Sequence, residues 1–221
     1  SYAAQERAQL PPGQIANQVY EVAFLNGDGY GIGWYADEDP LPCVFSSLKP
    51  AWNDQNLVNL SQKISSKVIF AHIRAAGPTT GVSDALCHPF SHGKYLFMHN
   101  GCMDGFDFVK RKMLAELDDI PFKVCMDHMC IDSAMAFAVF LNNLPRGPDE
   151  EHTTAEMCAA MRKTIEAFCR HHRADKRCWG VGTLLMNFVV SDGNTVLATR
   201  SAFCVSPQGE TTTINSFLCR D

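Results

Sequence analysis

The chain has 221 residues, of which 46% are hydrophobic and 19% are charged, and its formal net charge is −5. These proportions are ordinary for a globular protein with a substantial core. The acidic balance excludes nucleic acid as the main partner, because phosphate binding needs a basic face. No apolar run approaches the length of a membrane span. Residues 1–13 also lack the basic start and apolar stretch of a secretory signal.

The ten cysteines are scattered along the chain and form no C-x-x-C pair. A chain of this length does not need a disulfide framework. We therefore interpret them as reduced thiols, mostly small core residues, and expect a cytoplasmic protein.

The first half of the chain predicts strands. Glycines within residues 29–35 favour a strand with close backbone approaches. Residues 56–65 predict a short helix. Residues 67–74 and 95–99 are apolar runs that predict buried strands, and Asn100-Gly101 is typical of a turn.

The second half begins with helices at residues 106–117, 132–144 and 153–170. Asp132-Ser133 predicts a helix N-cap, and Thr153 with Glu156 predicts a capping box. Residues 183–191 and 195–201 then predict a β-hairpin. Strands, helices and strands in this order indicate a layered α+β fold rather than a parallel doubly wound sheet.

Two kinds of motif invite functions that their spacing does not support. The glycines around Gly31 lack the dinucleotide fingerprint, because Ile32 and Trp34 occupy the positions where its last glycine would stand. Cys87-His88 and the Cys/His groups at 125–130 and 169–178 lack the paired spacing of a zinc site. We expect no metal and no cofactor.

Three other features each have a structural and a functional interpretation. Arg74 ends an apolar strand, so it forms either a structural ion pair or a two-point contact with a substrate carboxylate. Asn100-Gly101 is either a plain turn or a pair of oxyanion donors. Asp132 is a helix cap, a ligand for a substrate ammonium, or both.

Taken together, these segments resemble the class II glutamine amidotransferases, whose nucleophile is an N-terminal residue. The closest branch is the stand-alone one that includes the γ-glutamyl hydrolase of ergothioneine synthesis and the glutathione-degrading amidotransferase subunit of fungi. The likeness covers roughly residues 1–200, and its strength lies in the order of several short motifs. They lie at residues 26–35, 50–57, 71–76, 87–90, 97–101, 132–133 and 187–193.

The resemblance implies a four-layer αββα sandwich, apparently without its first strand and possibly without its last strands. It assigns Arg74 to the α-carboxylate of a γ-glutamyl substrate and Asp132 to its α-ammonium. Asn100 and Gly101 would form the oxyanion hole, and His99 would belong to the substrate-binding residues. The substrate would be glutamine or a γ-glutamyl peptide such as glutathione, and a second protein subunit is a possible partner.

The nucleophile of this family is a cysteine at the mature N-terminus, whose α-amine acts as the base. The first cysteine in this sequence is Cys43. We therefore expect residues 1–221 to be a single, N-terminally truncated amidotransferase domain that is inactive alone but active in the full-length protein. The alternatives are a non-catalytic γ-glutamyl-binding scaffold and, with less support, a cysteine-rich metal protein.

Overall fold

The structure is a computed structural model that describes residues 26–36, 39–76 and 81–220. The segment 1–13 and any first strand of the expected sandwich lie outside these residues. The first sheet has three antiparallel strands in the order β2-β1-β3, with the short helix α3 between β2 and β3 in the chain. Its elements are β1 (Tyr30–Tyr35), β2 (Pro42–Ser47), a 3-10 turn (Ala51–Asn53), α3 (Gln55–Ser61) and β3 (Ile69–Ile73).

The second sheet is larger and antiparallel, with the order β4-β5-β7-β8-β6, and β9 pairs with β8 outside this path. A 3-10 turn (Asp84–Leu86) precedes it. The predicted strand at 95–99 is confirmed as β5. The strands are β4 (Phe90–His92), β5 (Tyr95–Asn100), β6 (Thr183–Leu185), β7 (Asn187–Ser191), β8 (Val196–Val205) and β9 (Thr211–Arg220).

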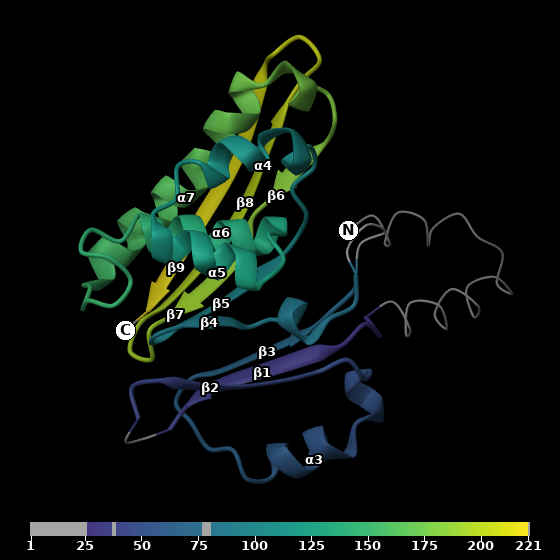
Figure 1. Cartoon of the computed structure of the whole chain (residues 1–221), viewed down its shortest axis with the longest axis vertical. Helices are drawn as coiled ribbons and strands as arrows, with labels where there is room; N and C mark the ends of the chain where they lie inside the picture. The colour runs from purple at the N-terminus through teal and green to yellow at the C-terminus, as the bar shows by residue number, and fades with distance from the viewer. Residues whose placement is uncertain (1–25, 37–38, 77–80, 221) are drawn as a thin grey trace, which may run out of the picture.

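Helices cover one face of this second sheet, and the smaller sheet lies on its other side (Figure 1). The main core fills the space between the helices and the large sheet, and includes Phe97, Phe137 and Phe188. The three helices predicted in the second half of the chain are confirmed, whereas α5 was not predicted. They are α4 (Phe106–Leu114), α5 (Asp119–Asp127), α6 (Asp132–Asn142) and α7 (Thr154–Ala174), followed by a 3-10 turn (Lys176–Cys178). Among the described residues, none of the helices is long and apolar enough to cross a membrane.

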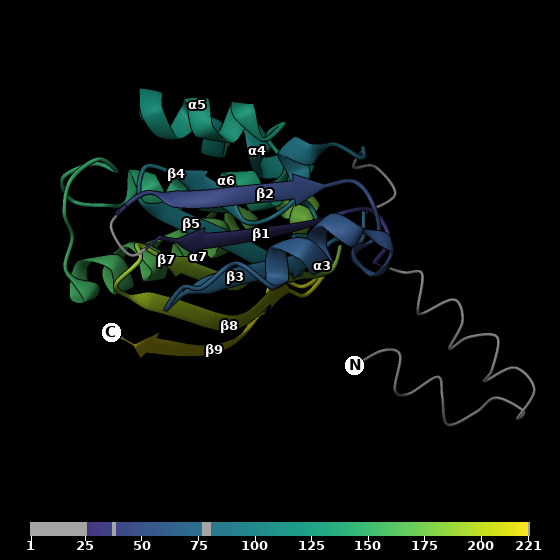
Figure 2. The same cartoon turned by 90° about the horizontal axis from the view of Figure 1, so that it is seen from below.

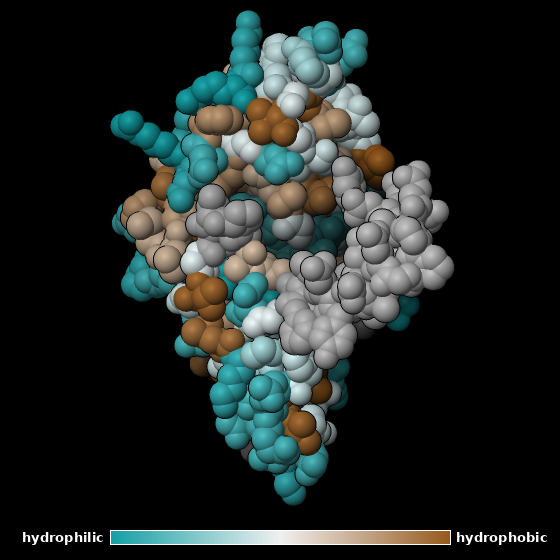
Figure 3. Space-filling view, turned by 90° about the vertical axis from the view of Figure 1, so that its right-hand side faces the viewer, coloured by the Kyte–Doolittle hydropathy of each residue, from teal (hydrophilic) through white to brown (hydrophobic). Residues whose placement is uncertain are grey.

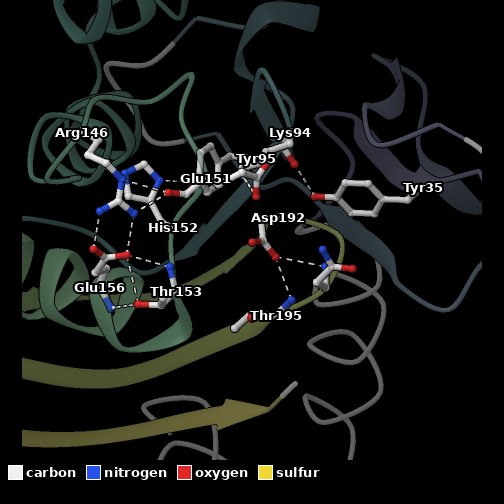
Figure 4. A network of polar contacts seen from close by, with 11 residues as sticks. Tyr35, Lys94, Tyr95, Arg146, Glu151, His152, Thr153, Glu156, Asp192 and Thr195 are labelled. Carbon is white, nitrogen blue, oxygen red and sulfur yellow. Dashed lines mark hydrogen bonds and ion pairs between the residues drawn. The ribbon is translucent and has the colours of Figure 1, made fainter.

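The two sheets contact each other through a second, smaller core made by Tyr35, Phe70 and Leu96. The hydroxyl of Tyr35 donates to the carbonyl oxygens of Lys94, at 2.7 Å, and Ser191, at 3.0 Å. Figure 4 shows this tyrosine reaching from the small sheet toward Lys94 and the network beyond it. With α3 beyond the small sheet (Figure 2), the layers follow the expected αββα order.

Helix α7 begins with the predicted capping box. The Thr153 hydroxyl accepts from the Glu156 N–H at 3.3 Å, and the Glu156 carboxylate accepts from the Thr153 N–H at 2.8 Å. Arg146 binds the same carboxylate with two nitrogens, at 2.6 and 2.8 Å (Figure 4). These bonds fix the start of α7 to the connection that follows α6.

Three sequence-based expectations need correction. Strand β3 is not buried on both faces, because Ile69 and Ile73 are about half exposed. The predicted hairpin strand at 183–191 is split, because the Thr199 hydroxyl binds the Phe188 N–H and the Met186 carbonyl in place of a ladder bond. Half of the ten cysteines are buried, rather than most of them, and all ten are free thiols.

Candidate active site

Strand β5 ends at the predicted oxyanion residues. Asn100 is its last residue and is exposed, and its side-chain amide has no hydrogen-bond partner among the described residues. Its carbonyl oxygen accepts from the Asn187 amide at 2.8 Å, which fixes the backbone where the turn begins. The side chain therefore stays available to a ligand.

Gly101 follows with φ of 153°, and its α-carbon lies close to the backbone of Leu185, the last residue of β6 in the same sheet. An added Cβ would lie 2.0 Å from the Leu185 carbonyl oxygen and 2.9 Å from His99 Nε2. No other residue fits there without moving backbone. Glycine is thus required by space as well as by conformation.

His99 is buried, and its ring connects β5 to the start of α6. Burial lowers its pKa, so the imidazole is neutral near pH 7. Its Nε2 lies 2.8 Å from the Leu185 carbonyl oxygen, which can only accept, so Nε2 carries the proton. Nδ1, 2.8 Å from the Ser133 hydroxyl, must then accept the hydroxyl proton.

Asp132 is the first residue of α6 and is partly exposed. It is not the N-cap that the sequence predicted: Ile131 occupies that position. Its Oδ1 accepts from the Ser133 N–H at 2.7 Å, and its Oδ2 accepts from the Met103 N–H at 3.1 Å. Two backbone donors thus orient a carboxylate that keeps free lone pairs for a cation.

The Met103 contact places Asp132 beside the turn that follows β5. His99, Asn100, Gly101 and Asp132 therefore form one cluster, joined through Met103 and Ser133. The role of Ser133 was missed in the sequence, where it was assigned only to the cap. Nothing in its local pattern indicates a partner on β5, because that contact spans 34 positions of the chain.

Arg74 lies at the end of β3, in the other sheet, and is only 6% exposed. One guanidinium nitrogen, Nη2, donates to the Gly81 carbonyl oxygen at 2.8 Å. The other, Nη1, is buried without a partner among the described residues. Within that part of the chain, the guanidinium forms no ion pair with a carboxylate, so half of its fork is available to a ligand.

Two histidines, His72 and His88, lie close enough to both Arg74 and His99 to interact with their charges. Burial lowers the pKa of His72, and nearby His99 and Arg74 lower it further, against a hydrogen bond to the His99 backbone that raises it. His72 Nε2 lies 3.5 Å from Nδ1 of the buried His88. In the described ranges, no group of three histidine, cysteine or acidic residues could hold a metal ion.

Both β3 and β5 run toward the right-hand side of Figure 1. Figure 3 views the molecule from that side and shows a face that is hollowed in its middle, with hydrophilic residues at the bottom. Two other grooves, of about 470 and 720 Å³, lie on the helical layer. Neither of these grooves is lined by any of the five predicted site residues.

Comparisons with known proteins bear on this arrangement. The family model described as class-II glutamine amidotransferases matches residues 20–207, which include all five predicted residues. The chain belongs to this family. Its resemblance, inferred from short motifs, is thereby confirmed, and the match ends before β9.

Among curated members of the amidotransferase family, the chain is 38% identical over 210 residues to the probable glutamine amidotransferase DUG3 of Saccharomyces cerevisiae. That alignment covers 86% of this chain and 57% of the yeast protein. The chain is 31% identical over 99 residues to a γ-glutamyl-hercynylcysteine sulfoxide hydrolase of Mycolicibacterium smegmatis, covering 42% of this chain and 43% of the hydrolase. The chain thus spans about half the length of these relatives.

A solved structure supports the fold of this chain. It is a glutamine aminotransferase class-II domain protein from Silicibacter pomeroyi, with a TM-score of 0.58 and 21% identity. The match covers 85% of this chain and 80% of that protein. The αββα layering is therefore that of the family.

Proposed function

We propose that the full-length protein hydrolyses a γ-glutamyl amide by acyl transfer, with glutamine or a γ-glutamyl peptide such as glutathione as substrate. The observation that carries this proposal is the carboxylate of Asp132, held by two backbone N–H groups next to the Asn100-Gly101 turn. A site for an ammonium and a site for an oxyanion then lie side by side. A γ-glutamyl substrate needs both sites, because its α-ammonium binds at the first and the oxyanion formed at its acyl carbon binds at the second.

Each residue has a physical task in this proposal. Asp132 binds the α-ammonium of the substrate, and the half-free fork of Arg74 binds its α-carboxylate. The Asn100 side chain and the Gly101 N–H stabilise the oxyanion that forms when the acyl carbon is attacked. His99 keeps Asp132 in place through Ser133.

The nucleophile is an N-terminal cysteine in this family, and the sequence has no cysteine before Cys43. We propose that residues 1–221 form one amidotransferase domain that binds substrate without turning it over, because clamp and oxyanion donors alone leave only residual catalysis. We further propose that the full-length protein acts in the cytoplasm, alone or with a second subunit. The yeast and mycobacterial relatives support the γ-glutamyl class of substrate by their names.

Glutamate release from glutamine and from glutathione tests the proposal, measured with the full-length protein and with this chain. We expect turnover by the full-length protein only, and binding of glutamine by both in calorimetry. Asp132→Asn should raise KM strongly while leaving the fold intact. Binding without turnover by the full-length protein would instead identify a non-catalytic γ-glutamyl-binding subunit.

A further inference from the structure

Two cysteine thiols meet at the junction of α5 and α6. The Cys125 thiol donates to Cys130 Sγ at 3.5 Å. The Cys130 N–H donates to the Cys125 carbonyl oxygen at 2.9 Å, which keeps the two α-carbons within about 7 Å, the outer limit for a disulfide. The two sulfur atoms would need to approach by about 1.5 Å to reach the length of a disulfide bond.

The two thiols differ in reactivity. The hydrogen bond from Cys125 lowers the pKa of the Cys130 thiol, and the ammonium of Lys110 lowers it further. The same interaction, together with burial, raises the pKa of Cys125. Cys130 also keeps 5% exposure, whereas Cys125 has none. Cys130 is thus the more acidic and the less buried of the two thiols, with Cys125 in contact with its sulfur.

The backbone between the thiols is unusual. Met129 has φ of 57° and Cys130 has φ of 50°, so two successive non-glycine residues are left-handed. Such a conformation costs energy and persists only where the surroundings impose it. Met126 and Met129 are about half exposed, so the turn lies at the surface rather than within the core.

This turn leads directly into the proposed substrate site. Ile131 follows Cys130 as the N-cap of α6, and Asp132 is the first helical residue. The Asp132 carboxylate depends on a 3.1 Å bond from Met103, a distance at which a small displacement matters. A covalent bond at Cys130 would therefore change the position of Asp132.

We propose that Cys125 and Cys130 form a thiol–disulfide exchange site for small-molecule disulfides, and that its oxidation weakens substrate binding by displacing Asp132. The second half of this statement rests on the proposed function. The Cys130 thiolate attacks one sulfur of the small disulfide and releases one small thiolate, which leaves a mixed disulfide. Cys125 then loses its proton and attacks Cys130 Sγ, releasing the second thiolate. The small disulfide gains two electrons, and the protein loses two hydrogen atoms.

Oxidised glutathione applied to the full-length protein tests the chemistry. After acid quenching, alkylation and trypsin digestion, both cysteines fall in the peptide of residues 124–146, which contains no other cysteine. We expect this peptide to lose two hydrogen atoms and to escape alkylation until a reductant is added. Cys169 is the matched control, because it is also buried and burial raises the pKa of its thiol to about 11. Full alkylation of peptide 124–146, or linkage of either cysteine to another peptide, would overturn the site.

Single variants test the order of attack. In Cys125→Ser, Cys130 should retain one glutathione as a stable mixed disulfide. In Cys130→Ser, the remaining Cys125 should stay unmodified under the same conditions. The reverse pattern would contradict the assignment of Cys130 as the attacking thiol.

Glutamate release tests the coupling to Asp132. We expect oxidation to raise KM at least fivefold, reversibly, in the wild-type protein. The Cys130→Ser variant retains any N-terminal cysteine. If oxidation also lowers the activity of this variant, the loss comes from oxidation of the nucleophile and not from the Cys125–Cys130 pair. Equal KM in the oxidised and reduced protein would refute the coupling. If the reduced protein releases no glutamate at all, the proposed function is wrong. The mass of peptide 124–146 after oxidation still tests whether Cys125 and Cys130 form the exchange site.

Discussion

The imidazole of His99 and the hydroxyl of Ser133 lie 2.8 Å apart and tie the middle of the large sheet to the first turn of α6. Because the His99 ring is neutral and its Nε2 proton goes to Leu185, the serine must donate. The Ser133 proton therefore goes to His99 rather than to Asp132 Oδ1, which lies 3.3 Å from the hydroxyl. Among the described residues, the N–H groups of Ser133 and Met103 are then the donors that hold the carboxylate. The sheet thus determines where the helix presents its acid.

Ser133→Ala should weaken substrate binding without touching the substrate. The change leaves His99 Nδ1 buried and unpaired, which costs about 1–3 kcal/mol and lowers Tm by roughly 5 °C. We expect KM to rise about tenfold, equivalent to ~1.4 kcal/mol, with kcat little changed. Thr164→Ala is the control, because it removes a buried hydroxyl bonded within α7 to Ala160. An equal rise of KM in both variants would show a general loss of stability instead.

Gly101→Ala should damage both folding and catalysis. The added methyl would meet the Leu185 carbonyl oxygen, and relief requires movement of the oxyanion turn. We expect kcat to fall roughly 100-fold, the size of effect seen when an oxyanion donor is lost. Gly147→Ala is matched, since Gly147 has φ of 88° but open space around its α-carbon. It should cost about 1 kcal/mol of stability and leave kcat unchanged.

The fold was predictable where local chemistry determined it. Helix α7 shows its capping box in the order of Thr153 and Glu156. Helix α5 was missed because Pro121 interrupts its pattern, although proline is tolerated in a first turn. Strand β9 was missed because nearly all of its residues are exposed, so no alternation marks it. Its pairing with β8 is made by backbone groups that every sequence shares.

The sequence proposes a set of residues for the site, and their roles stay a prediction, but it does not give their arrangement. Residue types and motif order pointed to Arg74, His99, Asn100, Gly101 and Asp132. The contact from His99 to the serine of α6 could not be predicted, because no local period relates residues 34 positions apart. The N-cap of α6 was also predicted one residue too late. Ile131 holds that position, and the Asp132 carboxylate accepts from the Met103 N–H outside the helix.

Arg74→Lys should separate substrate recognition from stability. Lysine keeps the charge but loses the planar fork, so its single ammonium would have to serve both the Gly81 carbonyl oxygen and the substrate carboxylate. We expect KM for glutamine to rise about 30-fold, equivalent to ~2 kcal/mol, with Tm nearly constant. Arg146→Lys is the opposite case, because its fork binds Glu156 at the start of α7. It should lower Tm and leave KM unchanged, and a KM effect there would contradict the assignment.

Stability should fall as the pH drops below about 6.5, because of the buried His88. Burial, with the charges of His72, His99, His128 and Arg74, lowers its pKa well below the ordinary value. Between that lowered pKa and 6.5, the unfolded chain binds a proton that the folded chain refuses, so each pH unit of acidification costs up to ~1.4 kcal/mol. The stabilisation is present above pH 6.5 and is lost as the pH falls.

Thermal unfolding between pH 7.5 and 5.5 measures this loss directly. In His88→Asn, which cannot titrate, the drop in Tm over that range should be smaller by about 3 °C per pH unit below 6.5. His92→Asn is the control, because His92 lies near Asp149 at 3.6 Å, and its side chain is partly exposed. Parallel Tm curves for the wild-type protein and His88→Asn would contradict this prediction. They would mean that His88 takes up a proton equally well in the folded and unfolded states.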